Sequence, residues 1–116
     1  MNTGVDIEEV QRFKHLLSNK PGLLKKIFTK YEWDYASKKN SAQTLAGLWC
    51  AKESVVKAMY ANGFSIMIRD VHICHKSNGV PHVQSIGGLN NFNLNSVSLS
   101  ISHTSSYAVA VCIISE

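Results

Sequence analysis

The feature that most constrains this chain is a segment that is apolar on nearly every side, residues 42–60, with the sequence AQTLAGLWCAKESVVKAMY. At about 100° per residue on a helix, its large apolar side chains form one broad arc, and its small residues form a second face suited to close packing. A helix that is apolar nearly all round lies at the centre of a domain. The sequence therefore predicts a long central helix, capped by Asn40 or Ser41 and stopped by the Asn62-Gly63 pair.

The two halves of the chain differ in the period of their apolar residues. Residues 1–61 predict a strand that hands over to a helix near Asp6, and then further helices, one of which begins at the capping-box sequence TKYE of residues 29–32. Residues 66–114 alternate with period two and predict two hairpins that turn at residues 77–79 and 104–106; the last strand, 107–114, is apolar on both faces. We expect one α+β domain over residues 1–116, with helices packed on a small antiparallel sheet.

Composition and charge narrow the range of partners. The 116 residues carry a formal net charge of +4 at pH 7, which favours acidic partners such as phosphates, nucleic acid or an acidic protein. The basic residues are scattered and form no single stripe, so a small phosphate ligand ranks above nucleic acid. No apolar run approaches the ~20 residues of a membrane span, and the first residues lack the features of a signal peptide. The sequence therefore predicts a cytoplasmic protein without membrane contact.

Three charges interrupt the apolar segment, namely Lys52, Glu53 and Lys57. In an ordinary helix Lys52 would run its stem over the core, and Glu53 and Lys57 would form an i,i+4 pair worth about 0.2–0.5 kcal/mol. Here the apolar surroundings leave little room for solvent, and desolvated charges without partners usually mark a site. One carboxylate with two ammonium groups suits a polyphosphate bound together with a hard cation.

Two further residues could complete such a site. Asp6, at the expected end of the first strand, offers a second carboxylate to a cation, although helix N-capping is the commoner use of such an aspartate. His103 shares a strand face with Val97 and Ile101 and is expected on the core side, at a strand end. A histidine there is usually a hydrogen-bonded core residue, but it could also donate to a ligand phosphate.

Three ordered segments carry a resemblance to a known family. They are GVDIEEVQRF at residues 4–13, LAGLWCAKESVVKA at residues 45–58 and VSLSISHTSSYAVA at residues 97–110. Together they resemble the holo-acyl-carrier-protein synthases, a 4'-phosphopantetheinyl transferase family, in order and spacing across nearly the whole chain. Residues 27–32 and 69–81 are similar to the intervening segments of that family. The resemblance implies the 4'-phosphopantetheinyl transferase fold.

The resemblance also implies an activity and a cofactor. The family transfers 4'-phosphopantetheine from coenzyme A to a serine of apo acyl carrier protein, in fatty acid biosynthesis, releases adenosine 3',5'-bisphosphate, and requires magnesium. Asp6 and Glu53 would hold the Mg²⁺ on the coenzyme A pyrophosphate, and Lys57 would stabilise charge on the leaving phosphate. These three would be the catalytic residues. The serine proton would pass to Glu53 or to a water on the cation near Asp6, and both routes remain open.

Binding residues and an assembly follow from the same resemblance. Coenzyme A would contact residues spread over the chain: Lys52, Lys57, Gly63, Pro81, Ser102 and His103. For Lys52, a phosphate contact and a structural pairing are both open. Arg12 matches a position that contacts the carrier protein, where a basic rim would steer an acidic helix. The family implies a homotrimer with coenzyme A between subunits, so that Asp6 and Glu53 would come from one subunit and the Ser102-His103 strand end from its neighbour.

Some positions depart from the family pattern, and other classes of protein remain as alternatives. Leu48 stands where an arginine is common, residues 61–63 replace a Gly-Thr-Gly turn, and Val80 replaces a lysine; these changes concern coenzyme A contacts rather than metal ligands. A catalytically silent carrier-protein or nucleic-acid binding domain would need the basic rim but not the paired carboxylates. A transition-metal site would have to use the histidine and cysteine side chains of the predicted first hairpin, which do not share one strand face: His72, Cys74, His75 and His82.

Overall fold

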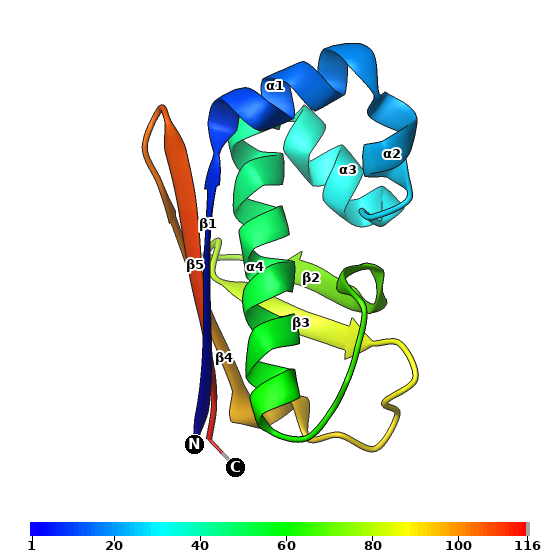
Figure 1. Cartoon of the computed structure of the whole chain (residues 1–116), viewed down its shortest axis with the longest axis vertical. Helices are drawn as coiled ribbons and strands as arrows, with labels where there is room; N and C mark the ends of the chain where they lie inside the picture. Colours follow the sequence, from blue (N-terminus) through cyan, green and yellow to red (C-terminus); the bar gives the residue numbers. More distant parts are fainter. Residues whose placement is uncertain (116) are drawn as a thin grey trace.

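The computed structural model describes residues 1–115 of the chain. Its elements follow in the order β1 (Asn2–Glu9), α1 (Val10–Asn19), α2 (Pro21–Lys25), α3 (Lys30–Ser37), α4 (Ser41–Ala61), η1 (Ile68–Asp70), β2 (Val71–His75), β3 (Pro81–Ile86), η2 (Leu94–Ser96), β4 (Val97–His103) and β5 (Tyr107–Ile114). The α-helices lie in the first half and four of the five strands in the second half, which confirms the predicted α+β class (Figure 1).

The helix α4 is the central element of the fold. It runs along an antiparallel sheet with the strand order β1-β5-β4, while the hairpin β2-β3 lies against another side and α1 to α3 gather at one end (Figure 1). Both predicted ends of this helix are confirmed. At the N-terminus the Asn40 side chain accepts a hydrogen bond from the Gln43 amide, and after the C-terminus Gly63 adopts a φ of 91°. Among residues 1–115, no helix is both long and apolar enough to cross a membrane.

Burial alternates along β5 and leaves one face of the sheet uncovered in the single chain. Ala108, Ala110, Cys112 and Ile114 are buried against α4, and the residues between them are exposed. This pattern confirms that the last strand is apolar on both faces. The exposed face continues onto β1, and its large apolar side chains are Val5, Ile7, Tyr107, Val109, Val111 and Ile113.

The first strand is longer than the sequence predicts. β1 pairs with β5 in an unbroken ladder that ends where Glu9 pairs with Tyr107, and α1 begins only at Val10. The prediction of a helix beginning near Asp6 is therefore wrong, and Asp6 lies inside the strand. It does not cap a helix either, because Glu9 holds the N-cap position of α1 and makes no side-chain cap bond. The complete set of ladder hydrogen bonds explains why the strand persists.

Both predicted hairpins are present. β2 pairs with β3 and β4 pairs with β5, all antiparallel, and Gly79, with a φ of 89°, lies in the first turn. The part of the prediction that extended the first hairpin back to Ile66 and Ile68 is wrong. There the Asp70 carboxylate accepts a hydrogen bond from the Met67 amide at 3.0 Å, and the chain forms the short 3-10 helix η1.

Candidate active site

The first part of the site forms where β1 lies against α4. A Cβ atom on Gly4 would lie 2.8 Å from the backbone nitrogen of Ala58 and would overlap the carbonyl oxygen of Ser54, so only glycine allows so close an approach. Because side chains alternate along a strand, Asp6 and Glu8 point to the same side of β1 as Gly4. The close contact therefore brings two strand carboxylates against the central helix.

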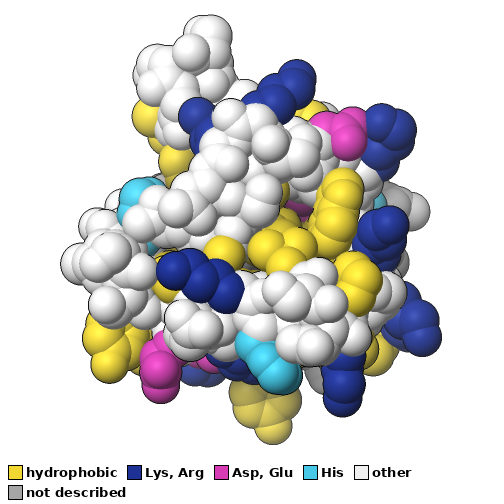
Figure 2. Space-filling view, turned by 90° about the horizontal axis from the view of Figure 1, so that it is seen from above, with side chains coloured by type: hydrophobic (Ala, Val, Ile, Leu, Met, Phe, Trp, Pro, Cys, Tyr) yellow, Lys and Arg dark blue, Asp and Glu magenta, His cyan; other side chains and the backbone are white. Residues whose placement is uncertain are grey.

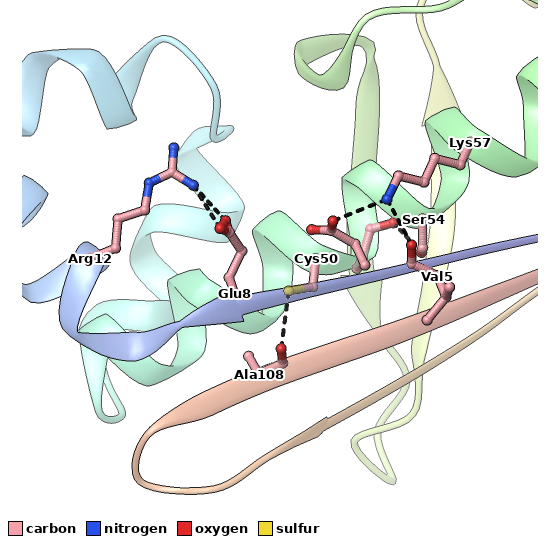
Figure 3. A network of polar contacts seen from close by, with 9 residues as sticks. Val5, Glu8, Arg12, Cys50, Ser54, Lys57 and Ala108 are labelled. Carbon is pink, nitrogen blue, oxygen red and sulfur yellow. Dashed lines mark hydrogen bonds and ion pairs between the residues drawn. The ribbon is translucent and has the colours of Figure 1, made fainter.

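Asp6 and Lys57 meet across this contact. Lys57 Nζ lies 3.3 Å from Asp6 Oδ1 and donates a hydrogen bond of 2.9 Å to the carbonyl oxygen of Val5, so the lysine bridges from α4 to β1 (Figure 3). The Asp6 side chain is only 16% exposed, whereas that of Lys57 is 52% exposed. The second carboxylate oxygen of Asp6, Oδ2, is buried and has no hydrogen-bond partner among the described residues. Asp6 therefore retains an unused acceptor beside a half-exposed ammonium group.

Glu53 lies in the electrostatic field of the same cluster. Burial raises the pKa of Glu53, and the negative charges of Asp6 and Glu8 raise it further, while the positive charges of Lys57 and Arg12 oppose the rise. The buried Cys50 thiol is affected by the same negative charges. Burial, and then the charges of the nearby carboxylates, raise the pKa of Cys50 to about 12. The flank of α4 that faces β1 thus carries an excess of negative charge at low solvent exposure.

The donor set of this cluster fits a hard divalent cation. Asp6 offers a buried oxygen without a partner, and the ionised form of Glu53 is disfavoured until a positive charge comes near. No group of three or more histidine, cysteine, aspartate or glutamate side chains suited to a metal ion occurs within residues 1–115. Two carboxylates alone match magnesium, which keeps several waters and takes further oxygens from substrate phosphates.

Arg12, the residue expected to meet a carrier protein, lies at the surface but is paired with a carboxylate of the same chain. Its Nη1 lies 2.7 Å and 2.5 Å from the two carboxylate oxygens of Glu8, which is only 16% exposed (Figure 3). The guanidinium also lies over the Trp49 ring, 5.2 Å from its centroid. The sequence reasoning missed Glu8, although its position two residues after Asp6 places both carboxylates on one face of a strand.

Other basic side chains are dispersed over the surface. Figure 2, a view from the end that carries α1, shows the lysine and arginine side chains around the rim, separated by polar and apolar groups and not joined in one stripe. This distribution matches the scattered basic residues of the sequence.

Lys52 has a structural role, which corrects its assignment to coenzyme A. Its side chain and that of Glu32 are fully buried, and the two charges lie 2.8 Å apart. Lys52 Nζ also donates to the carbonyl oxygen of Val71, and the other Glu32 oxygen accepts from the Ile73 amide at 2.7 Å. With every strong partner inside the core, the ammonium group cannot reach a ligand phosphate. Of the two roles left open for Lys52, the structure contains the pairing, and the partner Glu32 is visible in sequence only as part of a capping box.

The second part of the site is a cavity of about 240 Å³ on the β4 side of α4. His103 and Pro81 line it, together with Leu48 and Gly47 of the helix. His103 pairs with Ala108, whose side chain is buried against α4, so His103 lies on the core side of the sheet at a strand end, as expected. Its side chain is nevertheless exposed, because β4 is an edge strand and its end borders the cavity. The predicted coenzyme A residues His103 and Pro81 therefore lie together.

The structure does not bring the two parts together within one chain. Asp6 lies on β1 and His103 on β4, which are opposite edge strands of the sheet, and none of Asp6, Glu53 and Lys57 lines the cavity. Ser102 points to the opposite sheet face from His103, and Gly63 lies at the far end of α4. His103 therefore lines a cavity that Glu53 does not border.

The alternative transition-metal site finds no support within the described residues. His75 stacks on the Tyr35 ring with centroids 3.8 Å apart, and His72 is hydrogen-bonded to Ser85 Oγ at 2.9 Å. Both imidazoles are therefore engaged in side-chain contacts within the fold.

The chain is similar to proteins of one known family. Residues 2–112 match the family model ACPS, 4'-phosphopantetheinyl transferase superfamily. The holo-[acyl-carrier-protein] synthase of Caldicellulosiruptor saccharolyticus is 38% identical, covering 99% of this chain and 95% of the relative. The protein of the same name from Caldanaerobacter subterraneus is also 38% identical, with 95% and 91% covered.

Solved structures give the same answer at the level of the fold. The acyl carrier protein synthase of Mycobacterium tuberculosis has a TM-score of 0.75 and 29% identity, with 97% of this chain and 95% of that one covered. The holo-(acyl-carrier-protein) synthase from Bacillus anthracis in complex with CoA (3',5'-ADP) has a TM-score of 0.75 and 25% identity, with 97% and 94% covered. The resemblance seen in the sequence is confirmed, and the chain belongs to the holo-[acyl-carrier-protein] synthase family of the 4'-phosphopantetheinyl transferase superfamily.

Proposed function

We propose that the protein transfers 4'-phosphopantetheine from coenzyme A to a serine hydroxyl of an apo acyl carrier protein, as a cytoplasmic step of fatty acid biosynthesis. The products are the holo carrier protein and adenosine 3',5'-bisphosphate. Family membership supports this reaction, and the observation that carries it here is the half-buried carboxylate pair Asp6 and Glu53 beside Lys57. A domain that only binds a carrier protein or nucleic acid has no use for this costly charge cluster.

Asp6 and Glu53 are the residues that would hold Mg²⁺. The unpartnered Oδ2 of Asp6 and the raised pKa of Glu53 both favour a positive charge between strand and helix. The ion, when bound, would offset the charge of the coenzyme A pyrophosphate.

Lys57 would stabilise the leaving group. In the transfer, the serine oxygen forms a bond to the phosphorus of the phosphopantetheine, and the bond from that phosphorus to the oxygen of the leaving nucleotide phosphate breaks with its electron pair. Negative charge therefore grows on the leaving phosphate. Lys57 Nζ is fixed by Val5 and Asp6 but half exposed, so it is oriented before the substrate arrives and can still donate to a phosphate oxygen.

Glu53 is the proposed acceptor of the serine proton. Burial and the neighbouring carboxylates raise the pKa of Glu53 and bring its basicity closer to neutral pH, which suits a general base. Because the same group is proposed as a ligand of the cation, transfer to a water near Asp6 remains the competing route.

The active assembly is proposed to be a homotrimer with its sites between subunits. The exposed sheet face carries a row of large apolar side chains that includes Val5, Val109 and Val111, and an interface would remove this surface from water. A heterologous contact that closes on itself would also bring the β1 edge of one subunit to the β4 edge of the next. Sedimentation equilibrium should give three times the 12.8 kDa mass of the chain, and a fully active monomer would contradict the arrangement.

Mass spectrometry of the carrier protein tests the function directly. A purified apo acyl carrier protein, incubated with coenzyme A, Mg²⁺ and this protein, should gain the mass of one phosphopantetheine, and omission of coenzyme A should prevent the gain. If the carrier protein stays unmodified here while a known synthase modifies it in parallel, the transferase function is ruled out. The remaining interpretation is a catalytically silent binding domain.

A further inference from the structure

An ion pair closes the corner between the first strand and the first helix. Glu8 belongs to β1 and Arg12 to the first turn of α1, so their pairing across four residues depends on the corner and is not the usual helical i,i+4 contact. Arg12 Nη1 lies within hydrogen-bond distance of both Glu8 carboxylate oxygens. Within the free subunit, Glu8 thus neutralises the charge of the Arg12 guanidinium, which is expected to meet the carrier protein.

Aromatic rings hold the Arg12 guanidinium in place, and its nitrogens other than Nη1 are available to a partner protein. It lies over the rings of Phe13 and Trp49, and no hydrogen bond from its other nitrogens to a residue of the described chain is present. The side chain is 50% exposed. Because the aromatic rings already restrict the guanidinium, the main effect of Glu8 on Arg12 is to cancel charge.

A carrier protein must leave as well as bind. The transfer changes one serine, so the acidic surface that docks on the enzyme is the same in substrate and product. Docking energy shared by both does not lower the chemical barrier, and it slows release of the product. A carboxylate placed beside the docking arginine weakens binding of both forms and thereby speeds release.

We propose that Glu8 is an internal competitor for Arg12, which weakens docking of the acidic carrier protein so that the modified carrier is released rapidly. This inference rests on the proposed function and on the role of Arg12 that the family resemblance implies, namely contact with the carrier protein. It assigns to Glu8 a role in specificity and turnover rather than in the transfer itself.

Direct binding of a fluorescently labelled apo acyl carrier protein, measured by anisotropy without coenzyme A or Mg²⁺, isolates this effect from catalysis. Glu8→Gln removes the charge, keeps an acceptor for Arg12, and should lower Kd about fivefold at low salt, the upper range for an exposed ion pair. Glu8→Ala should also tighten binding. Glu9→Gln is the matched control, because Glu9 carries the same charge one residue away on the exposed side of β1; it should change Kd by less than about twofold.

The Arg12→Ala background completes the test. There, Glu8→Gln should no longer tighten binding, because the competitor has lost its target. The holo carrier should dissociate from Glu8→Gln about fivefold more slowly than from the wild type. Unchanged or weaker binding by both Glu8 variants, or an equal gain from Glu9→Gln, would overturn the inference while leaving the proposed function intact. Failure of the wild type to bind or modify any carrier would overturn the proposed function, and this inference with it.

Discussion

Lys52 and Glu53 are neighbours on α4, but the fold treats their charges in opposite ways. Lys52 turns into the core, where its ammonium group pairs with Glu32 and donates to the Val71 carbonyl oxygen. Glu53 turns toward β1, where burial and like charges raise its pKa. A charge with every partner inside the core stabilises the fold, whereas a carboxylate held among other carboxylates stores unfavourable energy that a ligand can relieve.

The contrast extends to the two flanks of the helix. On the flank that faces the hairpin, Glu32 joins three elements: it caps α3, pairs with α4 and accepts the Ile73 amide of β2. On the flank that faces β1, Asp6 keeps an acceptor that has no partner among residues 1–115. One flank of α4 therefore carries a buried ion pair, and the other carries the carboxylates that we propose as the active site.

The largest effect is expected at the carboxylates. Asp6→Asn or Glu53→Gln should lower kcat at least about a thousandfold with the fold intact, because each removes a charge proposed to hold Mg²⁺. Steady-state assays over a range of Mg²⁺ concentrations measure the loss, and excess Mg²⁺ should not restore the rate. Glu9→Gln, which removes an exposed charge of the same strand, should stay near wild-type activity. Near-normal turnover at limiting Mg²⁺ would remove the affected carboxylate from the site.

Lys52→Met should act on stability instead. It leaves Glu32 ionised and unpaired in the core, which costs about 3–5 kcal/mol of unfolding free energy. Adding Glu32→Gln removes the stranded charge and should recover most of the loss in a denaturant titration, while the folded double variant binds coenzyme A normally. Wild-type stability together with weakened coenzyme A binding would instead restore Lys52 to the ligand site.

Lys57→Ala should give an intermediate effect on chemistry. Its charge matters most as the leaving phosphate departs, so kcat should fall by about 10²-fold while the Kd for coenzyme A changes only a few-fold. Separate measurement of turnover and of equilibrium binding resolves the two. An increase in KM with unchanged kcat would assign Lys57 to ground-state binding.

The smallest effect concerns the pH dependence of stability. Since the folded pKa of Glu53 lies above its ordinary value of 4.5, the protonated carboxyl favours the folded state, and this contribution is lost as pH rises through the folded pKa. Glu53→Gln cannot ionise, so its Tm should exceed that of the wild type at pH 7 without divalent cations and should match it at pH 4. Added Mg²⁺ should narrow the gap. A lower Tm for the variant at pH 7 would show that Glu53 is not under electrostatic stress.

Local patterns predicted most of the fold. The caps at Asn40 and Thr29 and the turn at Gly79 depend on short-range chemistry, and all three are present in the structure. The end of β1 was not predictable in this way, because it depends on the ladder to β5, about a hundred residues away in sequence. Ile66 shows the same limit, since its alternation suits a strand but it has no strand partner.

The site was predictable only where partners are near in sequence or fixed by a motif. Asp6, Glu53 and Lys57 were proposed from the sequence, and the structure brings Asp6 and Lys57 into contact. The buried ion pair of Lys52 could not be predicted from the helix pattern. Its partner Glu32 belongs to α3, and a helical wheel of α4 does not show which residues of other elements pack against it. The Glu8 pairing with Arg12 was missed for a similar reason, since it depends on the strand continuing past Asp6.

We propose that the flank of α4 that carries Glu53 works with the β4 edge of a neighbouring chain. The most direct measurement is the transferase activity of mixed trimers assembled from Glu53→Ala and His103→Ala subunits, with the mixture verified by native mass spectrometry. Each variant alone should be nearly inactive, and mixing should restore activity, because some interfaces then pair an intact Asp6-Glu53 cluster with an intact His103. Verified mixed trimers that stay as inactive as their parents would contradict the shared site.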